Sequence, residues 1–427
     1  MSLSRRTISN ITYHKSSGKD DDSFVGLKIK GNEIHFYYPE AYHFEEDSKD
    51  LRNDIIAILS TIKIAKTQSK EKDELYTNRD NVSDFALDSY LWIIYDYMRN
   101  GYYVNREKEY KLNQKGKINW KRTLDTNPII SKSNNVIYNN VVVETPTNVD
   151  NIIVEIHKYC LKKSIDSIGW LFNLNSNFIN VMAFNDTKKN YYLSALRKEL
   201  NHTFDDDKKR RLIQFENVLK GLNAKLDNKD LVYGVDTYYY IYERMIDRVF
   251  GNEDVSKFYP KGEWYILKSD GAFEKKDSSD LRPDTILIHD YNGQKNAYIL
   301  DSKFYRYGIT DIESDLPSTS SIQKQVAYGD FVKTNKKNEF DNIYNAFLIP
   351  FDKKYDNRFK TDENLVYIGF SKTNISNKNN SHEFVHTFLI DLKHVITTWN
   401  KLNHDFDVND LIRKIDLASN EVKKLCD

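Results

Sequence analysis

The sequence predicts an α/β (α+β) protein. Its C-terminal half should build a mixed central sheet flanked by helices, next to a separate, mainly helical N-terminal region with short β-hairpins. Three observations carry this prediction. From residue 233 onward, segments with helical apolar spacing alternate with short apolar runs typical of strands. Within 281–307, the runs TILI and NAYIL flank Asn292-Gly293, the strongest short signal for a hairpin. Upstream of residue 228, amphipathic helical patterns dominate.

Length and composition limit the class of protein. At 427 residues the chain is long for one domain, so two or three are expected. Its 63 basic and 63 acidic residues give a formal net charge of zero, which argues against a uniformly basic surface. The two cysteines predict neither a disulfide framework nor a metal site. Without an apolar leader or a long apolar run, the chain is expected to be cytoplasmic, with no membrane contact.

The N-terminal elements follow from alternation, capping residues and helical spacing. In order, they are a mobile polar tail over 1–23, two short strands within 24–38, a helix over 51–62, a charged linker over 66–80 and a helix over 84–102. After the segment described next, a strand is predicted within 131–143, with helices over 149–171, 190–200 and 205–226. His157 is expected on a helix surface, because no second His or Cys lies at ligand spacing. The pattern breaks near Asn228, so the predicted domains cover 24–228 and 229–427.

Residues 106–124 are basic around one aromatic side chain. A turn at Lys115-Gly116 predicts a hairpin, and a helix followed by a basic hairpin is similar to a winged-helix unit. The residues that could contact a nucleic-acid backbone and its bases are Lys117, Trp120, Lys121 and Arg122. A solvated strand whose Trp120 packs inward explains the same pattern equally well, so both interpretations stay open.

The segment 233–251 predicts a helix with an apolar stripe and with Glu243 among its apolar neighbours. A half-buried carboxylate costs free energy unless a cation or donor compensates it. Ion pairs within the helix, between Arg244 and either Glu243 or Asp247, are the alternative. A short strand is predicted at 264–267.

The hairpin that follows brings two carboxylates together. If Asn292 and Gly293 are the two turn residues, counting outward along the strands places Asp284 directly opposite Asp301. Side chains alternate along a strand, so Lys303 shares a face with Asp301. Like charges placed opposite each other destabilise a strand pair, and a divalent cation between them would reverse that cost. Solvated acids at strand ends are the plainer explanation.

The remaining C-terminal elements complete the sheet and its cover. After a loop over 308–321, a helix over 322–333 carries Gln325 and Tyr328 three residues apart on one face. The further predicted elements are strands over 342–350, 365–371 and 384–392, and helices over 392–399 and 408–425.

This ensemble resembles the PD-(D/E)xK nuclease superfamily, with Pro283-Asp284 as the PD element and Asp301-Ser302-Lys303 as the (D/E)xK element. It is similar more specifically to the LlaJI-type restriction endonucleases, which are related to McrC nuclease subunits. The matching segments are GKINWKRTL, IYERMIDRVFG, LRPDTIL, ILDSKFY and IQKQVAY. They lie between residues 101 and 350. Ser321 departs from the pattern, since an acidic residue is expected before the Ile-x-Lys-Gln run.

The resemblance implies a PD-(D/E)xK core and a role for each residue. Asp284, Asp301 and Glu243, with the Ser302 carbonyl, would hold Mg²⁺, for which Mn²⁺ can substitute. Lys303 would orient or deprotonate the attacking water. Gln325 and Tyr328 would position phosphate or water.

The implied function is a Mg²⁺-dependent DNA endonuclease of a bacterial restriction-modification system. The implied partners are double-stranded DNA, a cognate methyltransferase and a separate AAA+ GTPase of the McrB kind, since the chain has no G-x-x-x-x-G-K-[ST] loop. The N-terminal region would then recognise DNA or dock on that motor. A non-catalytic DNA-binding or adaptor protein of the same fold, or an RNA or repair nuclease, is the alternative.

Overall fold

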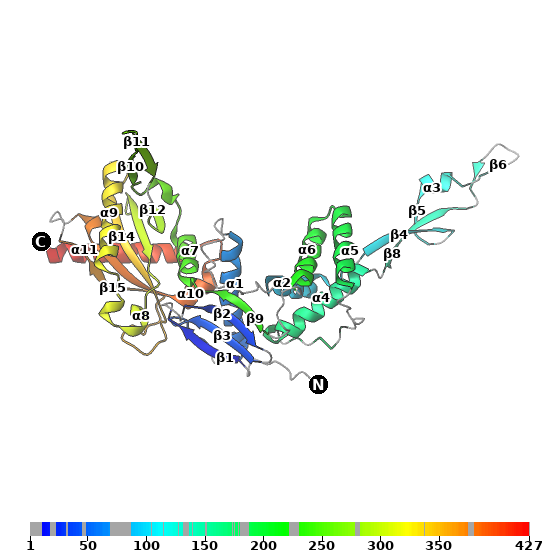
Figure 1. Ribbon diagram of the computed structural model, residues 1–427, viewed down its shortest axis with the longest axis horizontal. Coiled ribbons are helices and arrows are strands. Elements are labelled where there is room, and N and C mark those ends of the chain that lie inside the picture. Colours follow the sequence, from blue (N-terminus) through cyan, green and yellow to red (C-terminus); the bar gives the residue numbers. More distant parts are fainter. Residues whose placement is uncertain are drawn as a thin grey trace. The chain divides into compact units, whose positions relative to one another are not determined.

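The protein is described by a computed structural model (Figure 1). It describes residues 11–17, 23–30, 33–44, 48–68, 87–103, 105–113, 115–126, 128–130, 136–138, 140–149, 152–172, 174, 176–177, 179, 188–221, 230–277, 282–336, 338–374 and 380–426. The chain divides into two compact units, residues 1–82 with 228–427 and residues 83–227. The predicted mixed α/β fold is confirmed.

The first unit contains more of the N-terminal chain than the sequence predicts. We expect one N-terminal region over 24–228, but the part before residue 83 belongs with the C-terminal half. The cause is a long-range strand pair, since β2 (Val25–Lys30) is antiparallel to β9 (Asp230–Val235). The predicted mobile tail also needs correction. Within it β1 (Ile11–Ser16) pairs in parallel with β3 (Glu33–Pro39), and the resulting sheet has the order β1-β3-β2-β9.

Local predictions for this part of the chain hold. The two strands expected within 24–38 are β2 and β3, which pair antiparallel. The expected helix is α1 (Ser48–Gln68), and most of the predicted charged linker lies outside the described residues. The Asp54 carboxylate of α1 accepts hydrogen bonds from the Tyr42 hydroxyl and the Lys393 ammonium, both at 2.9 Å. This buried contact fastens α1 to the C-terminal half.

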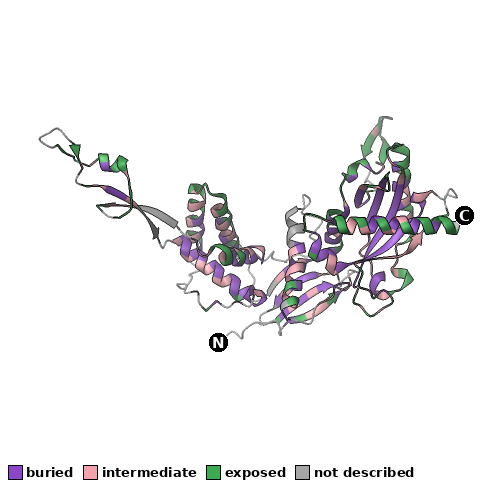
Figure 2. Ribbon diagram, turned by 180° about the vertical axis from the view of Figure 1, so that it is seen from behind, coloured by how far each residue is buried: buried purple, intermediate pink, exposed green. Residues whose placement is uncertain are grey.

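A five-stranded mixed sheet forms the centre of the first unit. Its order is β12-β13-β14-β16-β15, with β12 and β15 as antiparallel edges and the three inner strands parallel. The strands are β12 (Thr285–Tyr291), β13 (Gln294–Ser302), β14 (Asn342–Phe351), β15 (Leu365–Ser371) and β16 (Val385–Asp391). All five match predicted strands. The inner strands are apolar on both faces, as expected for strands covered from both sides, and Figure 2 shows them buried.

Helices cover both faces of this sheet. Ala297 and Ile299 pack in one core cluster with Tyr328 of α9 (Thr319–Asn335). Between them in sequence, Tyr298 faces the other way and stacks on Tyr344, with a distance of 5.3 Å between ring centroids. The negative charge of Asp416 on α11 (Asp405–Cys426) acts on Tyr298, so α9 and α11 cover opposite faces. Beside α11 packs α7 (Tyr238–Phe250), which is shorter than predicted because residues 230–235 form β9.

The smaller elements of the first unit connect these layers. They are η5 (Val255–Lys257), β10 (Glu263–Leu267), β11 (Phe273–Asp277), α8 (Tyr307–Thr310), η6 (Glu313–Asp315), η7 (Ser381–Glu383) and α10 (Leu392–Thr398). The strand predicted at 264–267 is β10, and it pairs only with β11 among the described residues.

The second unit is a helical bundle with a strand-built arm. The bundle consists of α2 (Leu87–Asn100), α4 (Ile152–Ile168), η3 (Gly169–Phe172), α5 (Lys189–His202) and α6 (Asp206–Gly221), which confirms the helices predicted there. The arm differs from the prediction. Instead of forming a hairpin, β4 (Asn105–Leu112) and β5 (Lys117–Ile118) both pair with β8 (Val142–Val149). The arm also carries α3 (Trp120–Leu124) and the pair β6 (Ile129–Ile130) and β7 (Val136–Ile137).

The turn between β12 and β13 gives a first testable prediction. Asn292 and Gly293 have φ values of 52° and 76°, both left-handed, as a type I′ turn requires. We expect Gly293→Ala to destabilise the protein by about 1 kcal/mol, because an L-residue is strained in this region. A Cβ at Gly293 would meet nothing within 4 Å, so no clash contributes. Asn292→Gly should change stability by less than about 0.5 kcal/mol. Equal denaturation midpoints for the two variants would contradict the turn assignment.

Candidate active site

The predicted hairpin register is confirmed. Strands β12 and β13 pair from Tyr291 opposite Gln294, next to the turn, to Thr285 opposite Leu300. The next pair in this register is Asp284 and Asp301. Asp284 Oδ2 accepts a hydrogen bond from the backbone N–H of Ser302 at 2.7 Å. The two carboxylates therefore meet at one end of the hairpin, where β12 begins and β13 ends.

Lys303 follows directly at the end of β13. Its ammonium forms an ion pair with Asp301 Oδ2, which confirms that the two side chains meet. Its backbone N–H donates to the carbonyl of Leu348 on β14 at 2.9 Å, so the parallel neighbour fixes the chain at this point. Burial alone would lower the pKa of Lys303, but the carboxylates of Asp301 and Asp284 outweigh it and raise that pKa. The Lys303 side chain is therefore a stably charged ammonium.

Glu243 reaches the same place from α7. Burial raises the pKa of Glu243 to about 7, with the Lys303 charge opposing the rise and the Asp301 charge adding to it. Two of the charges that act on Glu243 thus belong to the end of β13.

Asp284 is the most strongly perturbed of these acids. Burial, together with the negative charges of Asp301 and Glu243, raises the pKa of Asp284 to about 9. Lys303 and the Ser302 N–H work against this rise but do not cancel it. Three carboxyl groups therefore share a half-buried space with one ammonium.

This donor set fits a hard divalent cation in its chemistry. Carboxylate and carbonyl oxygens are the ligands that Mg²⁺ takes in proteins, and a nearby cation lowers the pKa of carboxyl groups that repel each other. Among the described residues, no group of three His, Cys, Asp or Glu side chains stands ready to enclose an ion. The fit therefore rests on the neighbourhood of the acids and on their electrostatics.

The helix α9 supplies the two further residues that the sequence singles out. Gln325 is completely buried, and its Nε2 donates to the Ile299 carbonyl of β13 at 2.6 Å. The Gln325 Oε1 is also buried, and no described residue hydrogen-bonds to it. One turn later, burial and the charges of Asp301 and Asp284 raise the pKa of the Tyr328 hydroxyl, which places Tyr328 beside both acids. Gln325 thus fastens α9 to β13, and the Tyr328 hydroxyl lies within electrostatic range of both carboxyl groups.

The residues predicted for DNA contact lie in the second unit, on the arm. Trp120 is 60% exposed at the start of α3, so it does not pack inward. Lys117, Lys121 and Arg122 are also exposed. The Arg122 guanidinium lies 3.7 Å from the centroid of the Tyr110 ring. These residues lie together on the arm, and their contact with DNA stays a prediction.

His157 requires a correction. We expect it on a helix surface, but it is completely buried, and its Nδ1 accepts a hydrogen bond from the Tyr103 N–H at 2.8 Å. Burial lowers the pKa of His157 to about 3, so it is a neutral core residue. Sequence spacing argued against a ligand role but could not show that α6 packs over this face of α4.

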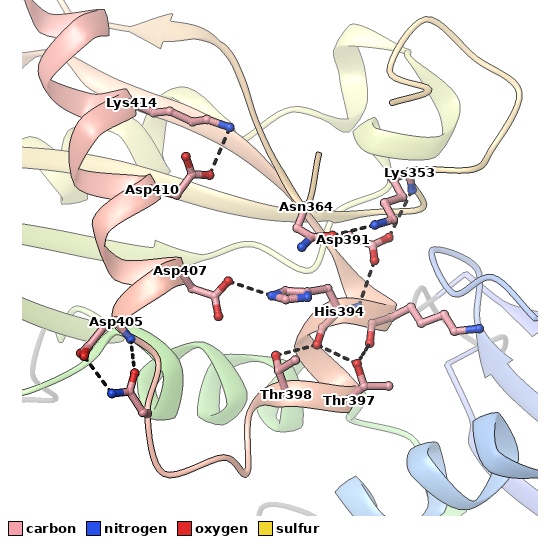
Figure 3. A network of polar contacts seen from close by, with 12 residues as sticks. Lys353, Asn364, Asp391, His394, Thr397, Thr398, Asp405, Asp407, Asp410 and Lys414 are labelled. Atoms are coloured by element: carbon pink, nitrogen blue, oxygen red, sulfur yellow. Dashed lines mark hydrogen bonds and ion pairs between the residues drawn. The ribbon is translucent and has the colours of Figure 1, made fainter. Parts of the chain in front are cut away.

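A pocket of about 240 Å³ lies elsewhere in the first unit, lined by residues of α7, β15, α10 and α11. Figure 3 shows the polar network around it. His394 Nε2 lies 2.8 Å from Asp407 Oδ1, and Lys414 Nζ lies 3.2 Å from Asp410 Oδ2. Several charges of this pocket thus pair with one another, and none of the predicted site residues lines it.

Sequence reasoning missed the exposed apolar side chains of the arm. At the arm, the side chains of Ile129, Ile130, Val136 and Ile137 are 48% to 69% exposed. Two β-branched dipeptides set in polar sequence were the available signal, but apolar pairs of this kind are more often buried.

In the part of the chain that the structure describes, no helix is long and apolar enough to cross a membrane.

The perturbed acids predict a pH-dependent stability. The unfolded chain releases the Asp284 proton near pH 4, whereas the folded protein keeps it until about pH 9. The folded state binds the extra proton in this window, so metal-free stability falls as the pH rises. We expect Asp284→Asn to flatten this slope and to raise stability at pH 8 by about 1 kcal/mol or more.

Chemical denaturation in EDTA between pH 5 and 9 measures this effect. Asp290→Asn, which removes an exposed carboxylate from the same strand, should leave the slope of the wild type unchanged. A stability profile for Asp284→Asn that runs parallel to the wild type would contradict the charge cluster.

Comparison with known proteins now bears on this site. Residues 24–376 match the family described as LlaJI restriction endonuclease. The Type II restriction enzyme BsuMI component YdjA of Bacillus subtilis (strain 168) is 26% identical over 366 residues, which cover 80% of this chain and 74% of the relative.

Two solved assemblies are distantly similar. One is the refined half-complex from the tetradecameric assembly of Thermococcus gammatolerans McrB AAA+ hexamers with bound McrC. It has a TM-score of 0.38 at 13% identity and covers 92% of this chain and 83% of that chain. The cryo-EM structure of the Thermococcus gammatolerans McrBC complex has a TM-score of 0.24 at 12% identity, covering 55% and 69%. Because the family match spans most of its length, the chain belongs to the LlaJI restriction endonuclease family.

Proposed function

We propose that this chain is the Mg²⁺-dependent nuclease component of a restriction system and that it hydrolyses DNA phosphodiester bonds where β12 begins and β13 ends. Family membership supports a restriction nuclease. The observation that carries the site is the convergence of three carboxyl groups and one ammonium, from Glu243, Asp284, Asp301 and Lys303. Such strongly perturbed groups cluster where proteins perform chemistry.

The acids are the groups that would hold the ion. Asp284, Asp301 and Glu243 offer carboxylate oxygens, and the Ser302 carbonyl offers a fourth ligand. When bound, Mg²⁺ or Mn²⁺ would supply Lewis acidity and make bound water a stronger nucleophile. Burial, and after it the negative charges of neighbouring acids, raises the pKa of Asp284 and Glu243, and a bound cation would favour their charged forms.

Lys303 is suited to stabilise negative charge and not to accept a proton. Its pKa is raised above the ordinary lysine value, so the ammonium keeps its proton at neutral pH. A charged ammonium can donate to a water molecule and to the oxygens of a phosphate as negative charge develops. Of the two roles that the sequence suggests for Lys303, we therefore propose orientation and charge stabilisation.

The two α9 residues divide their roles. Tyr328 has a raised pKa, so its hydroxyl remains protonated and can donate a hydrogen bond to phosphate or water near Asp301 and Asp284. Gln325 holds the Ile299 carbonyl two residues before Asp301. We propose that Gln325 positions β13 and α9 with respect to each other, with its buried Oε1 as the atom left to bind water.

Partner subunits complete the proposal. The Bacillus subtilis relative is by name one component of a restriction enzyme, and we propose that this chain likewise acts with companion polypeptides. These would include a cognate methyltransferase and a McrB-like AAA+ GTPase, since the sequence has no nucleotide-binding loop of its own. The exposed apolar side chains of β6 and β7 support protein docking by the arm, because such side chains gain more from a protein surface than from a phosphate backbone.

Plasmid cleavage tests the site. With Mg²⁺ and the companion component present, we expect Asp301→Asn and Asp284→Asn to lower the cleavage rate at least ~100-fold, because each replaces a charged carboxylate ligand with a neutral amide. Lys303→Gln should lower the cleavage rate by a similar factor. Lys303→Arg should retain more activity than Lys303→Gln, because it keeps the positive charge.

Asp290→Asn is the matched control and should cleave like the wild type, since Asp290 is exposed on the same hairpin. Cleavage by Asp301→Asn at the wild-type rate would refute the site. A wild type that binds DNA but cleaves neither DNA nor RNA, with Mg²⁺ or Mn²⁺ and all companions present, would instead support the non-catalytic adaptor.

A further inference from the structure

The hairpin of β10 and β11 exposes apolar side chains on both of its faces. Figure 1 shows it projecting beyond β12 at one end of the first unit, and Figure 2 shows it coloured as exposed. The exposed fractions run from 45% to 68% for Trp264, Tyr265, Ile266, Leu267 and Phe273. An isolated two-stranded ribbon is at best marginally stable in water, and clustered apolar exposure of this kind marks an interaction surface.

The charges of this hairpin argue against DNA as its occupant. Lys275 Nζ lies 2.5 Å from Glu263 Oε1, and Lys268 Nζ lies 3.7 Å from Glu274 Oε2. Segment 263–277 holds four acids and three lysines, so it offers phosphate no excess positive charge. The surface instead combines aromatic and aliphatic side chains, which favour a protein.

We propose that the open edge of β10 pairs with β10 of a second copy of this chain. The backbone hydrogen bonds of the hairpin show which groups are available. Lys268 N–H donates to Ala272 O at 2.8 Å, which makes these two a hydrogen-bonded pair. Because such pairs alternate along an antiparallel ladder, Ile266 and Trp264 also point their backbone groups toward β11. Tyr265 points its N–H and C=O outward, to the open edge.

The sequence of β10 suits pairing with itself. In an antiparallel pair centred on Tyr265, that residue lies opposite its own copy, and Trp264 lies opposite the copy of Ile266. No like charges meet, and the four apolar side chains of Trp264 and Ile266 gather on one face. Strand edges are normally protected by lysine, proline or a bulge, and WYIL contains none of these.

The strand order of the resulting sheet limits the assembly to two copies. Four strands in the order β11-β10-β10-β11 place FEKKD, which carries Lys275 and Lys276, at both outer edges. Lysine-bearing edges resist further strand addition, so the pairing stops at two copies with twofold symmetry. The pairing itself does not depend on cleavage.

Proline variants test the edge directly. We expect the wild type to sediment at micromolar concentration with twice the 50.4 kDa mass of one chain. Tyr265→Pro removes an outward N–H without removing a bond to β11, so it should sediment as a monomer. Lys275→Pro makes the same change on the edge of β11 and should remain a dimer. Circular dichroism confirms that both variants are folded.

Cysteine crosslinking tests the register, in a Cys426→Ser background. In a hydrogen-bonded pair the Tyr265 Cα atoms would lie about 5.5 Å apart, within the range of about 4.4–6.8 Å that a disulfide spans. Tyr265→Cys should therefore form a covalent dimer on oxidation. Phe273→Cys should not, because Phe273 is also exposed but would lie two strands further from its copy.

A wild type that remains monomeric at high concentration would overturn the proposal, and so would equal crosslinking of the two cysteine variants. Loss of the dimer in Lys275→Pro as well as in Tyr265→Pro would also refute the β10 edge. None of these measurements uses DNA cleavage, so their failure is distinguishable from failure of the proposed function.

Discussion

The candidate active site depends on the two-sided pairing of β13. Along its length β13 is antiparallel to β12 and parallel to β14, so neither edge of its backbone is free to move. At its end, Asp284 accepts from the Ser302 N–H on one side, and the Lys303 N–H donates to Leu348 on the other. The Gln325 amide holds the Ile299 carbonyl from above the sheet. These contacts fix the backbone that carries Asp301 and Lys303, which is the rigidity that a site of defined geometry requires.

The same pairing forces charges together that would otherwise separate. Asp284, Asp301 and Glu243 share a half-buried space with one ammonium, and burial together with the neighbouring negative charges raises the pKa of Asp284 and of Glu243. Such a cluster destabilises the folded chain, and proteins retain arrangements of this kind where they serve function. The strain is local, since the surrounding core of Ile286, Ala297 and Ile299 is apolar and closely packed. The strands β12 and β13 therefore contribute both to the apolar core, which stabilises the fold, and to the candidate site at their ends.

The sequence predicted those features that short-range geometry determines. The Asn292-Gly293 turn fixes the hairpin register, and that register alone brings Asp284 to Asp301. Features that depend on distant partners were not predictable in this way. The pairing of β2 with β9 moves residues 25–30 into the C-terminal unit, and no local pattern shows it. His157 is buried because α6 covers it, and β5 pairs with β8 because residues 142–149 return along the arm.

The electrostatics of the chain bear on how it would engage DNA. A formal net charge of zero gives no long-range attraction to a polyanion, and the acids at the end of β13 repel phosphate unless a cation is present. Affinity for DNA must then come from local basic groups, from bound metal or from companion subunits. Both exposed apolar surfaces, on the arm and on the β10–β11 hairpin, suit contacts with protein. On the proposed function, partner proteins bound at these surfaces would set where the nuclease centre meets DNA.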